Sequence, residues 1–143
     1  MRYKAPPIKL SRPTVPIAVD IVIIHKGKIV LVKRVINPYR GYFTLPGGFV
    51  IPGQTTRETC LKEAKEETGL DVKIIKLIDV FDDPHRDPRG HTASVAYLCK
   101  SAGGKLKPQK TETSEVKLFS PKEIKKLDLG FDHKQIIKDA GFI

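Results

Sequence analysis

Three glutamates in the middle of the chain, Glu63, Glu66 and Glu67, are the residues best suited to chemistry. On a helix, their spacing puts all three on one side. Like charges this close repel one another, so a positive charge among them would stabilise the group. A hard divalent cation fits that need, because Mg²⁺ is held by a few carboxylates and keeps waters and substrate phosphates as further ligands.

The residues around these glutamates predict the helix that would carry them. Thr55 and Glu58 have the spacing of a capping box, and Gly69 suits the C-terminal end of a helix. One quadrant of this helix is apolar or small and should face the core; it holds Cys60, Leu61, Ala64 and Thr68. The carboxylates border that buried stripe. A solvated acidic helix flanked by lysines remains the competing interpretation.

The loop before the helix bends sharply twice. Pro46-Gly47-Gly48 and Pro52-Gly53 bracket a short apolar run. Together, loop and helix resemble the signature of the Nudix hydrolases, G-x5-E-x7-R-E-U-x-E-E-x-G-U, where U is a bulky apolar residue. The matching residues are Gly48, Glu63, Ala64, Glu66, Glu67, Gly69 and Leu70. Two positions depart from the signature: Gln54 replaces its first glutamate, and Lys62 replaces its arginine.

The resemblance implies an α/β fold, the Nudix-type α/β/α sandwich around a mixed β-sheet. It also implies metal-dependent cleavage of a nucleoside diphosphate linked to another moiety, with Mg²⁺ as the cofactor and Mn²⁺ as a possible substitute. By resemblance, Glu63, Glu66 and Glu67 are the catalytic carboxylates and metal ligands, and the Gly48 carbonyl is a further ligand. Gln54 and Lys62 put metal affinity and rate in doubt more than the fold.

Length and composition agree with one small enzyme. The 143 residues form a single predicted Nudix domain, and no apolar run has membrane-spanning length. Without an apolar leader at the N-terminus, we expect a cytoplasmic protein, in which Cys60 and Cys99 are small buried hydrophobes. The net charge of +10 suits anionic ligands. Because the lysines are scattered, small nucleotides are favoured over nucleic acid.

The remaining pattern predicts the elements that must position the site. Strands are expected at residues 15–24, 29–35, 72–81, 92–100 and 115–119. The first of these is an apolar run with one interruption, Asp20. A short helix should follow Ser120-Pro121, and Asp132 should cap a final helix with Ile136 and Ile137 on its apolar side.

A second stretch, residues 82–97, narrows the substrate. It resembles small ADP-ribose pyrophosphatases, in which a D-P-R-G core precedes an S-V-A-Y-like strand. Arg86 and Arg89 in this loop could grip diphosphate oxygens, or form local salt bridges with the aspartates around them. Arg34, at a strand end, is a third substrate-binding candidate unless it is simply solvated. Adenine could stack on Tyr39 or Tyr42.

The general base is expected outside the signature, because a glutamine at position 54 cannot accept the proton. Glu112 is the preferred candidate over Glu115. The alternative is that Glu112 is an exposed loop glutamate without a catalytic role. Three functions remain open: an ADP-ribose pyrophosphatase yielding AMP and ribose 5-phosphate; a Nudix hydrolase of nucleoside triphosphates or dinucleoside polyphosphates; and a non-catalytic nucleotide-binding module. The resemblance also implies a possible homodimer.

Overall fold

A computed structural model describes residues 13–108 and 113–143. Within these ranges four strands precede the first helix, and three strands and two helices follow it. In order they are β1 (Ile17–His25), β2 (Lys28–Arg34), β3 (Phe43–Thr44), β4 (Gly47–Phe49), α1 (Thr56–Thr68), β5 (Leu70–Phe81), β6 (Ala93–Gly104), β7 (Thr113–Phe119), α2 (Pro121–Lys126) and α3 (His133–Asp139).

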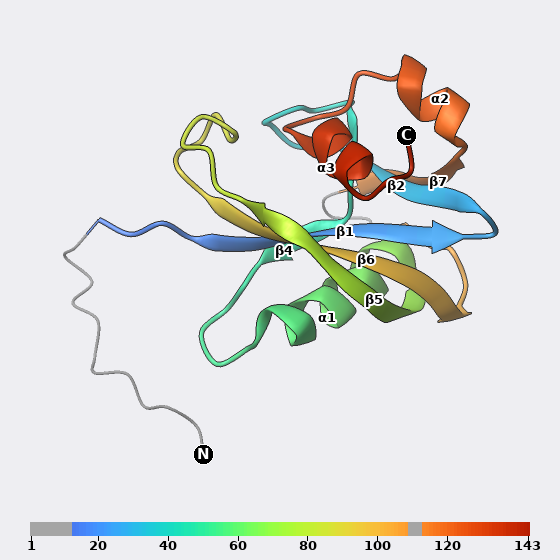
Figure 1. The fold of residues 1–143 in the computed structure, drawn as a ribbon, viewed down its shortest axis with the longest axis horizontal. Coiled ribbons are helices and arrows are strands. Elements are labelled where there is room, and N and C mark those ends of the chain that lie inside the picture. The colour runs from blue at the N-terminus through green and yellow to red at the C-terminus, as the bar shows by residue number, and fades with distance from the viewer. Residues whose placement is uncertain (1–12, 109–112) are drawn as a thin grey trace.

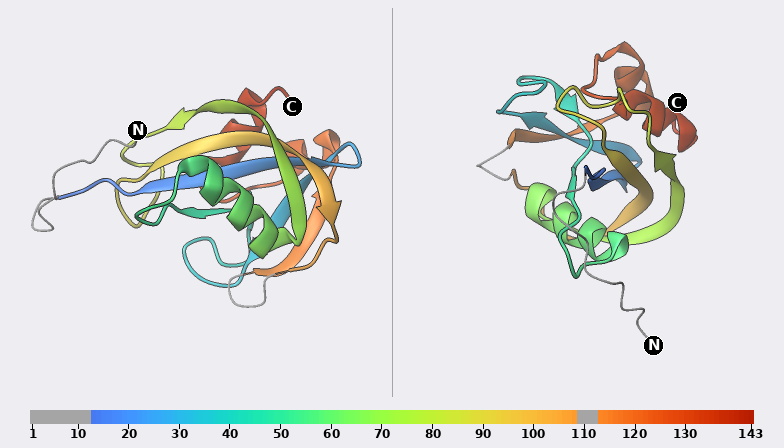
Figure 2. Two further views of the ribbon diagram at one scale, coloured as in Figure 1. Left: turned by 90° about the horizontal axis from the view of Figure 1, so that it is seen from below. Right: turned by 90° about the vertical axis from the view of Figure 1, so that its left-hand side faces the viewer.

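The strands form one mixed sheet between two layers of helix. Its order is β3-β2-β1-β6-β5, with β4 paired to β1 and β7 paired to β2. The β1–β6 pair is parallel, and the other pairs are antiparallel. Helix α1 covers one face, and α2 and α3 lie over the other (Figure 1). Two further views agree with this layering (Figure 2). The predicted α/β/α sandwich is therefore confirmed.

Strand β1 supplies apolar side chains to both faces because successive residues of a strand point to opposite sides. Ile21 and Ile23 pack in the cluster that includes residues of α1, whereas Val22 packs with residues of α2 and α3. All three side chains are fully buried. Asp20 has the parity of Val22, so its carboxylate points to the α3 side, where its partners lie.

Helix α1 has the predicted boundaries. Thr55 and Glu58 form a complete capping box, and Gly69 ends the helix in the left-handed conformation with φ of 78°. The buried side includes Cys60, Ala64 and Thr68, as expected. The predicted burial of Leu61 is wrong, because 45% of its surface is exposed. Thr59 and Glu67 are buried instead, so the helix is turned slightly from the predicted quadrant.

The predicted strands differ from the observed ones mainly at their ends. The largest extension is at the end of β6, which continues to Gly104 and pairs with β5 from Leu70–Gly104 to Phe81–Ser94. Asp132 occupies the N-cap position of α3, but its side chain makes no capping hydrogen bond. Its carboxylate binds an arginine instead, as described below. In the described part of the chain, no helix is long and apolar enough to cross a membrane.

Candidate active site

One cavity of about 290 Å³ collects the predicted site residues. Its walls come from α1, from β1 to β4, from the loop between β5 and β6, and from the segment before α3. The predicted residues that line it are Arg34, Gly48, Glu63, Glu66, Glu67, Arg86 and Arg89. Glu112 lies outside the described residues. These predicted residues lie up to 55 positions apart in sequence, from Arg34 to Arg89, and all reach one space.

The three glutamates of α1 have different surroundings. Glu67 is only 6% exposed, and its Oε2 accepts a hydrogen bond of 2.7 Å from the Gly47 amide. Glu63 lies directly beside Gly48, because a Cβ on that glycine would sit 2.5 Å from the Glu63 Cδ. Glu66 is the outermost of the three and faces Lys62 at 4.0 Å. Two carboxylates therefore converge on the backbone of β4.

The donors at this position fit a hard divalent cation. Glu63 and Glu67 are oxygen donors, and glycine at position 48 lets the backbone approach the Glu63 carboxylate closely. In residues 13–108 and 113–143, no three His, Cys, Asp or Glu side chains are gathered as a complete ligand set. Mg²⁺ does not need such a set, because it takes one or two carboxylates together with waters and substrate phosphates.

The two loop arginines have different partners. Arg89 makes the expected local salt bridge: its Nε and Nη2 bond the two oxygens of Asp87 at 3.1 and 2.8 Å. Its side chain is still 47% exposed, and its guanidinium lies over the rings of Phe49 and Phe131. Burial would raise the pKa of Asp87, but the hydrogen bonds from Arg89 lower it. Arg89 is thus a fixed cation at the cavity wall.

Arg86 takes partners distant in sequence, so the local salt bridge that stood as the alternative to diphosphate binding is not formed. Its side chain is 4% exposed. Nε and Nη2 bond the carboxylate of Asp132 at 2.9 and 2.7 Å, Nη2 also reaches Asp20 at 3.2 Å, and Nη1 donates to the Thr92 hydroxyl at 3.1 Å. Burial would lower the pKa of Arg86, but the hydrogen bonds and charges of Asp132 and Asp20 raise it.

Asp20 is the centre of a buried polar network beneath the cavity. Its carboxylate is 8% exposed. It accepts from the Ser94 hydroxyl at 2.6 Å and from Arg86, and His133 Nε2 lies 3.2 Å from its Oδ1. Burial would raise the pKa of this carboxyl, but the facing His133, the Ser94 hydroxyl and the charge of Arg86 lower it to about 2. Asp20 is therefore ionised at neutral pH.

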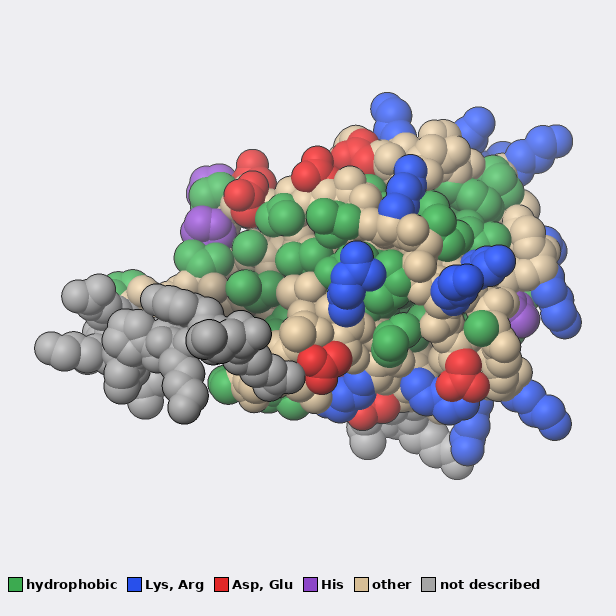
Figure 3. Space-filling view, turned by 60° about the horizontal axis from the view of Figure 1, so that its bottom comes forward, with side chains coloured by type: hydrophobic (Ala, Val, Ile, Leu, Met, Phe, Trp, Pro, Cys, Tyr) green, Lys and Arg blue, Asp and Glu red, His purple; other side chains and the backbone are tan. Residues whose placement is uncertain are grey.

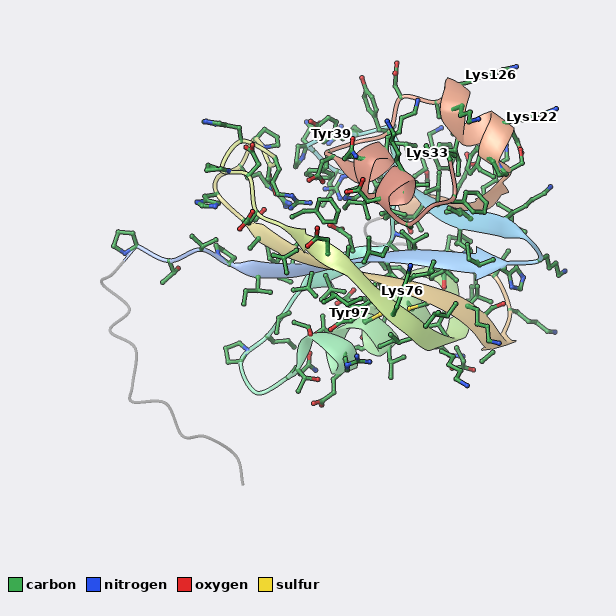
Figure 4. The ribbon with its side chains drawn as sticks, viewed as in Figure 1. Lys33, Tyr39, Lys76, Tyr97, Lys122 and Lys126 are labelled. Carbon is green, nitrogen blue, oxygen red and sulfur yellow. The ribbon has the colours of Figure 1, made fainter. Side chains whose placement is uncertain are left out.

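Aromatic side chains gather at the outer wall of the cavity. Tyr39 lies on the α3 side of the sheet (Figure 4), where its ring packs on Phe131 at 4.7 Å and on Tyr42 at 5.5 Å. The guanidinium of Arg34 lies 5.3 Å from the centre of the Phe131 ring, and Arg34 Nε donates to the Pro38 carbonyl at 2.7 Å. Phe131 itself lines the cavity. A nucleobase or sugar could therefore meet aromatic surface beside two cations.

Sequence reasoning missed Asp20, Asp132 and His133 as site residues. The signal for Asp20 was present, since it is the one charge within an otherwise apolar strand. Asp132 was assigned to capping, which its spacing suits equally well. The pairing of these residues joins β1 to the start of α3, more than 100 positions later. Only the fold brings them together.

The two departures from the Nudix signature lie at the margin of the site. Gln54 does not line the cavity, and its Oε1 accepts a hydrogen bond of 3.4 Å from the Thr59 hydroxyl. Lys62 faces Glu66 from the same helix. The two departures that put metal affinity and rate in doubt therefore lie outside the cavity lining to which Glu63 and Glu67 belong.

The combination of an α/β/α sandwich, carboxylates on α1 and cations around one cavity defines a class of protein that handles phosphorylated ligands. Comparison with known proteins is specific about the class. The NUDIX domain family model matches residues 14–140. The chain therefore belongs to the Nudix family, and its enzyme class is that of the Nudix pyrophosphohydrolases.

Among relatives, the chain is 45% identical over 123 residues to the ADP-ribose pyrophosphatase of Methanocaldococcus jannaschii, covering 86% of this chain and 71% of that protein. It is 29% identical to the ADPR responsive transcriptional repressor NtrR of Acinetobacter baylyi, covering 92% of this chain but 55% of the repressor. Among solved structures, the NUDIX domain of Shewanella oneidensis NrtR complexed with ADP ribose superposes with a TM-score of 0.84 at 26% identity, covering 92% of this chain and 89% of that one.

Proposed function

We propose that this Nudix protein hydrolyses ADP-ribose to AMP and ribose 5-phosphate with a divalent cation, Mg²⁺ or in its place Mn²⁺. The observation that carries the reaction class is the convergence of Glu63 and Glu67 on the backbone of β4, in the same cavity as Arg89. The 45% identity to an ADP-ribose pyrophosphatase supports the substrate.

The cation would be held by Glu63, Glu67 and the Gly48 carbonyl, with Glu66 nearby. A divalent cation supplies neutralisation of diphosphate charge and activation of water. Glu67 is held for this role by the Gly47 amide, which fixes its Oε2. Glu66, being exposed, has room to adjust when phosphate oxygens arrive.

Two arginines that line the same cavity would hold the diphosphate. Arg89 is oriented by Asp87 and by two aromatic rings, so little side-chain freedom is lost when it meets an anion. Arg34 is the last residue of β2, and its guanidinium lies over the Phe131 ring. We keep both as substrate-binding residues. Arg86 we reassign from gripping the substrate to positioning, since its guanidinium is buried and bonds Asp132, Asp20 and Thr92.

The chemical step replaces one P–O bond of the diphosphate bridge by a P–O bond to water. The oxygen of the attacking water goes to one phosphate, the bridging oxygen leaves with the other, and the water proton is taken by a base. Glu112 is our candidate for that base. Glu112→Gln should lower kcat with little change in KM, and unchanged turnover would remove Glu112 from the mechanism.

The assembly and the location are part of the proposal. We propose a single domain over residues 1–143 in the cytoplasm, where free Cys60 and Cys99 are the expected state. Apolar side chains gather on the face in Figure 3, and the edge strand β5 exposes about half of Ile75, Leu77 and Val80. Exposed apolar surface on an edge strand suits a homodimer. Light scattering should then give twice the mass of one chain.

The reaction is tested by incubating the protein with ADP-ribose and Mg²⁺ and separating the products by ion-exchange chromatography. We expect AMP and ribose 5-phosphate in equal amounts, and no cleavage by Glu67→Gln. Tight ADP-ribose binding without cleavage would favour the non-catalytic module. Faster turnover of a nucleoside triphosphate or a dinucleoside polyphosphate would favour the other hydrolase.

A further inference from the structure

We infer that His133 and Asp20 are positioning residues that fix the backbone of residues 45–47 and, through it, the Glu67 carboxylate. This inference deepens the proposed function and rests on it for the role of Glu67. Neither residue belongs to the Nudix signature described above. Both are almost completely buried, with exposed fractions of 4% and 8%.

The backbone of residues 45–47, where β4 begins, is held from both faces of the sheet. The Leu45 amide donates to His133 Nδ1 at 2.9 Å, and the Gly47 amide donates to Glu67 Oε2 at 2.7 Å. Pro46 between them has no amide hydrogen, and its carbonyl accepts from the Ile21 amide at 2.9 Å. Because α3 and α1 cover opposite faces (Figure 1), both helices hold this short piece of backbone.

The hydrogen bond from Leu45 sets the tautomer of His133. An amide N–H can only donate to a ring nitrogen that carries a lone pair, so Nδ1 is unprotonated. The ring proton of the neutral imidazole then sits on Nε2 and points to Asp20 Oδ1, 3.2 Å away. An ionised Asp20 favours this arrangement. The carboxylate therefore selects the form of His133 that can accept the Leu45 amide.

Asp20 is itself held in place. Ser94 and Arg86 bond its Oδ2 at 2.6 and 3.2 Å, and Arg86 makes two hydrogen bonds to Asp132, the residue before His133. The network thus begins and ends at the start of α3. In the described part of the chain, every buried side-chain nitrogen or oxygen has a partner. A network with all its members satisfied is rigid and costly to break.

There is little room for β4 to move independently of Asp20. A Cβ on Gly47 would lie 2.1 Å from the Val19 carbonyl oxygen and 2.9 Å from Asp20 Oδ1. Close packing of this kind transmits displacement, because the atoms have no free space to take it up. Loss of the His133 acceptor should release the Leu45 amide and shift the Gly47 amide. Glu67 would then lose the contact that fixes Oε2.

The test compares His133→Leu with His133→Asn, whose side-chain oxygen can still accept the Leu45 amide. The readouts are Mn²⁺ binding by calorimetry in the absence of substrate, the Gly47 amide resonance in ¹⁵N–¹H spectra, and kcat and KM for ADP-ribose. His25→Asn is the matched control. His25 is the last residue of β1, and at the usual rise per residue of a strand it lies about 16 Å from Asp20.

We expect His133→Leu to weaken Mn²⁺ binding and lower kcat by about 10-fold or more, as supporting residues of metal ligands do. KM should change little, the Gly47 resonance should move, and His133→Asn should recover part of each loss. Wild-type Mn²⁺ affinity and an unmoved Gly47 resonance in folded His133→Leu would overturn the inference. If that variant does not fold, Ser94→Ala, which loosens Asp20, should act in the same direction, and wild-type values there would equally overturn it. If wild type fails to cleave ADP-ribose, the proposed function fails, but metal binding and the resonance still decide this inference.

Discussion

Replacing Gly48 by alanine should separate catalysis from stability. The added Cβ would lie 2.5 Å from Glu63 Cδ and 2.7 and 2.9 Å from its two oxygens. Those atoms are the far end of a flexible side chain, so the carboxylate should swing aside while the fold persists. Gly48 does not have a positive φ, so alanine is compatible with its backbone conformation.

The magnitude follows from the displacement. Glu63 Cδ must move by about 0.9 Å, from 2.5 Å to the 3.4 Å at which ordinary contact begins. A misplacement of about 1 Å in a reacting site can cost about 10²-fold in rate, which is about 2.7 kcal/mol in activation free energy. The free energy of unfolding should change by less than about 1 kcal/mol, because alanine also reduces the freedom of the unfolded chain.

The assay measures kcat/KM for ADP-ribose with Mg²⁺ and the free energy of unfolding in urea. Gly103→Ala is the matched control, since its Cβ would meet only Asp71, at 3.4 and 3.9 Å, and its φ is not positive either. We expect about 10²-fold loss for Gly48→Ala and none for Gly103→Ala. Wild-type activity in folded Gly48→Ala would refute the assignment of Glu63 to the reacting site.

Three further predictions concern stability and the signature. Because the pKa of Asp20 falls from 3.8 to about 2 on folding, its ionised form contributes about 2 kcal/mol to the free energy of unfolding. This contribution is fully present above about pH 4 and is lost as the pH falls towards 2. In an acid titration, the free energy of unfolding should therefore fall less steeply for Asp20→Asn than for wild type, and identical slopes would contradict this. Thr55→Ala removes the α1 capping box and should lower the free energy of unfolding by about 1 kcal/mol. A urea unfolding curve with the midpoint and slope of wild type would contradict that. Gln54→Glu should leave the Mg²⁺ dependence of turnover unchanged, because Gln54 does not line the cavity; a lower Mg²⁺ requirement would show that it reaches the metal.

The fold could be predicted because its signals are local. The apolar run of β1, the capping box of Thr55 and the helix end at Gly69 each depend on neighbouring residues, and each is observed. The error at Leu61 has a physical reason. Sequence periodicity gives the apolar arc of a helix, but tertiary packing decides how the helix is rotated, and here it exposed Leu61 and buried Glu67.

The site could be predicted only in part. The glutamates of α1 share one helix, so their spacing revealed them, and the structure brings them to the same cavity as Arg34 and Arg89. The partners of Arg86 could not be found this way. The sequence offered diphosphate oxygens or the nearest aspartates as its partners, but burial within the fold paired it with Asp20 and Asp132. Non-local ion pairs leave no spacing pattern in a sequence.

The central claim is that this Nudix protein is an ADP-ribose hydrolase, and one measurement tests it most directly. The specificity constant kcat/KM is determined with Mg²⁺ for ADP-ribose, NADH, a dinucleoside polyphosphate and oxidised dGTP, each at the same enzyme concentration. The account predicts the highest value for ADP-ribose. An equal or higher value for oxidised dGTP, or no turnover of ADP-ribose with either Mg²⁺ or Mn²⁺, would contradict it.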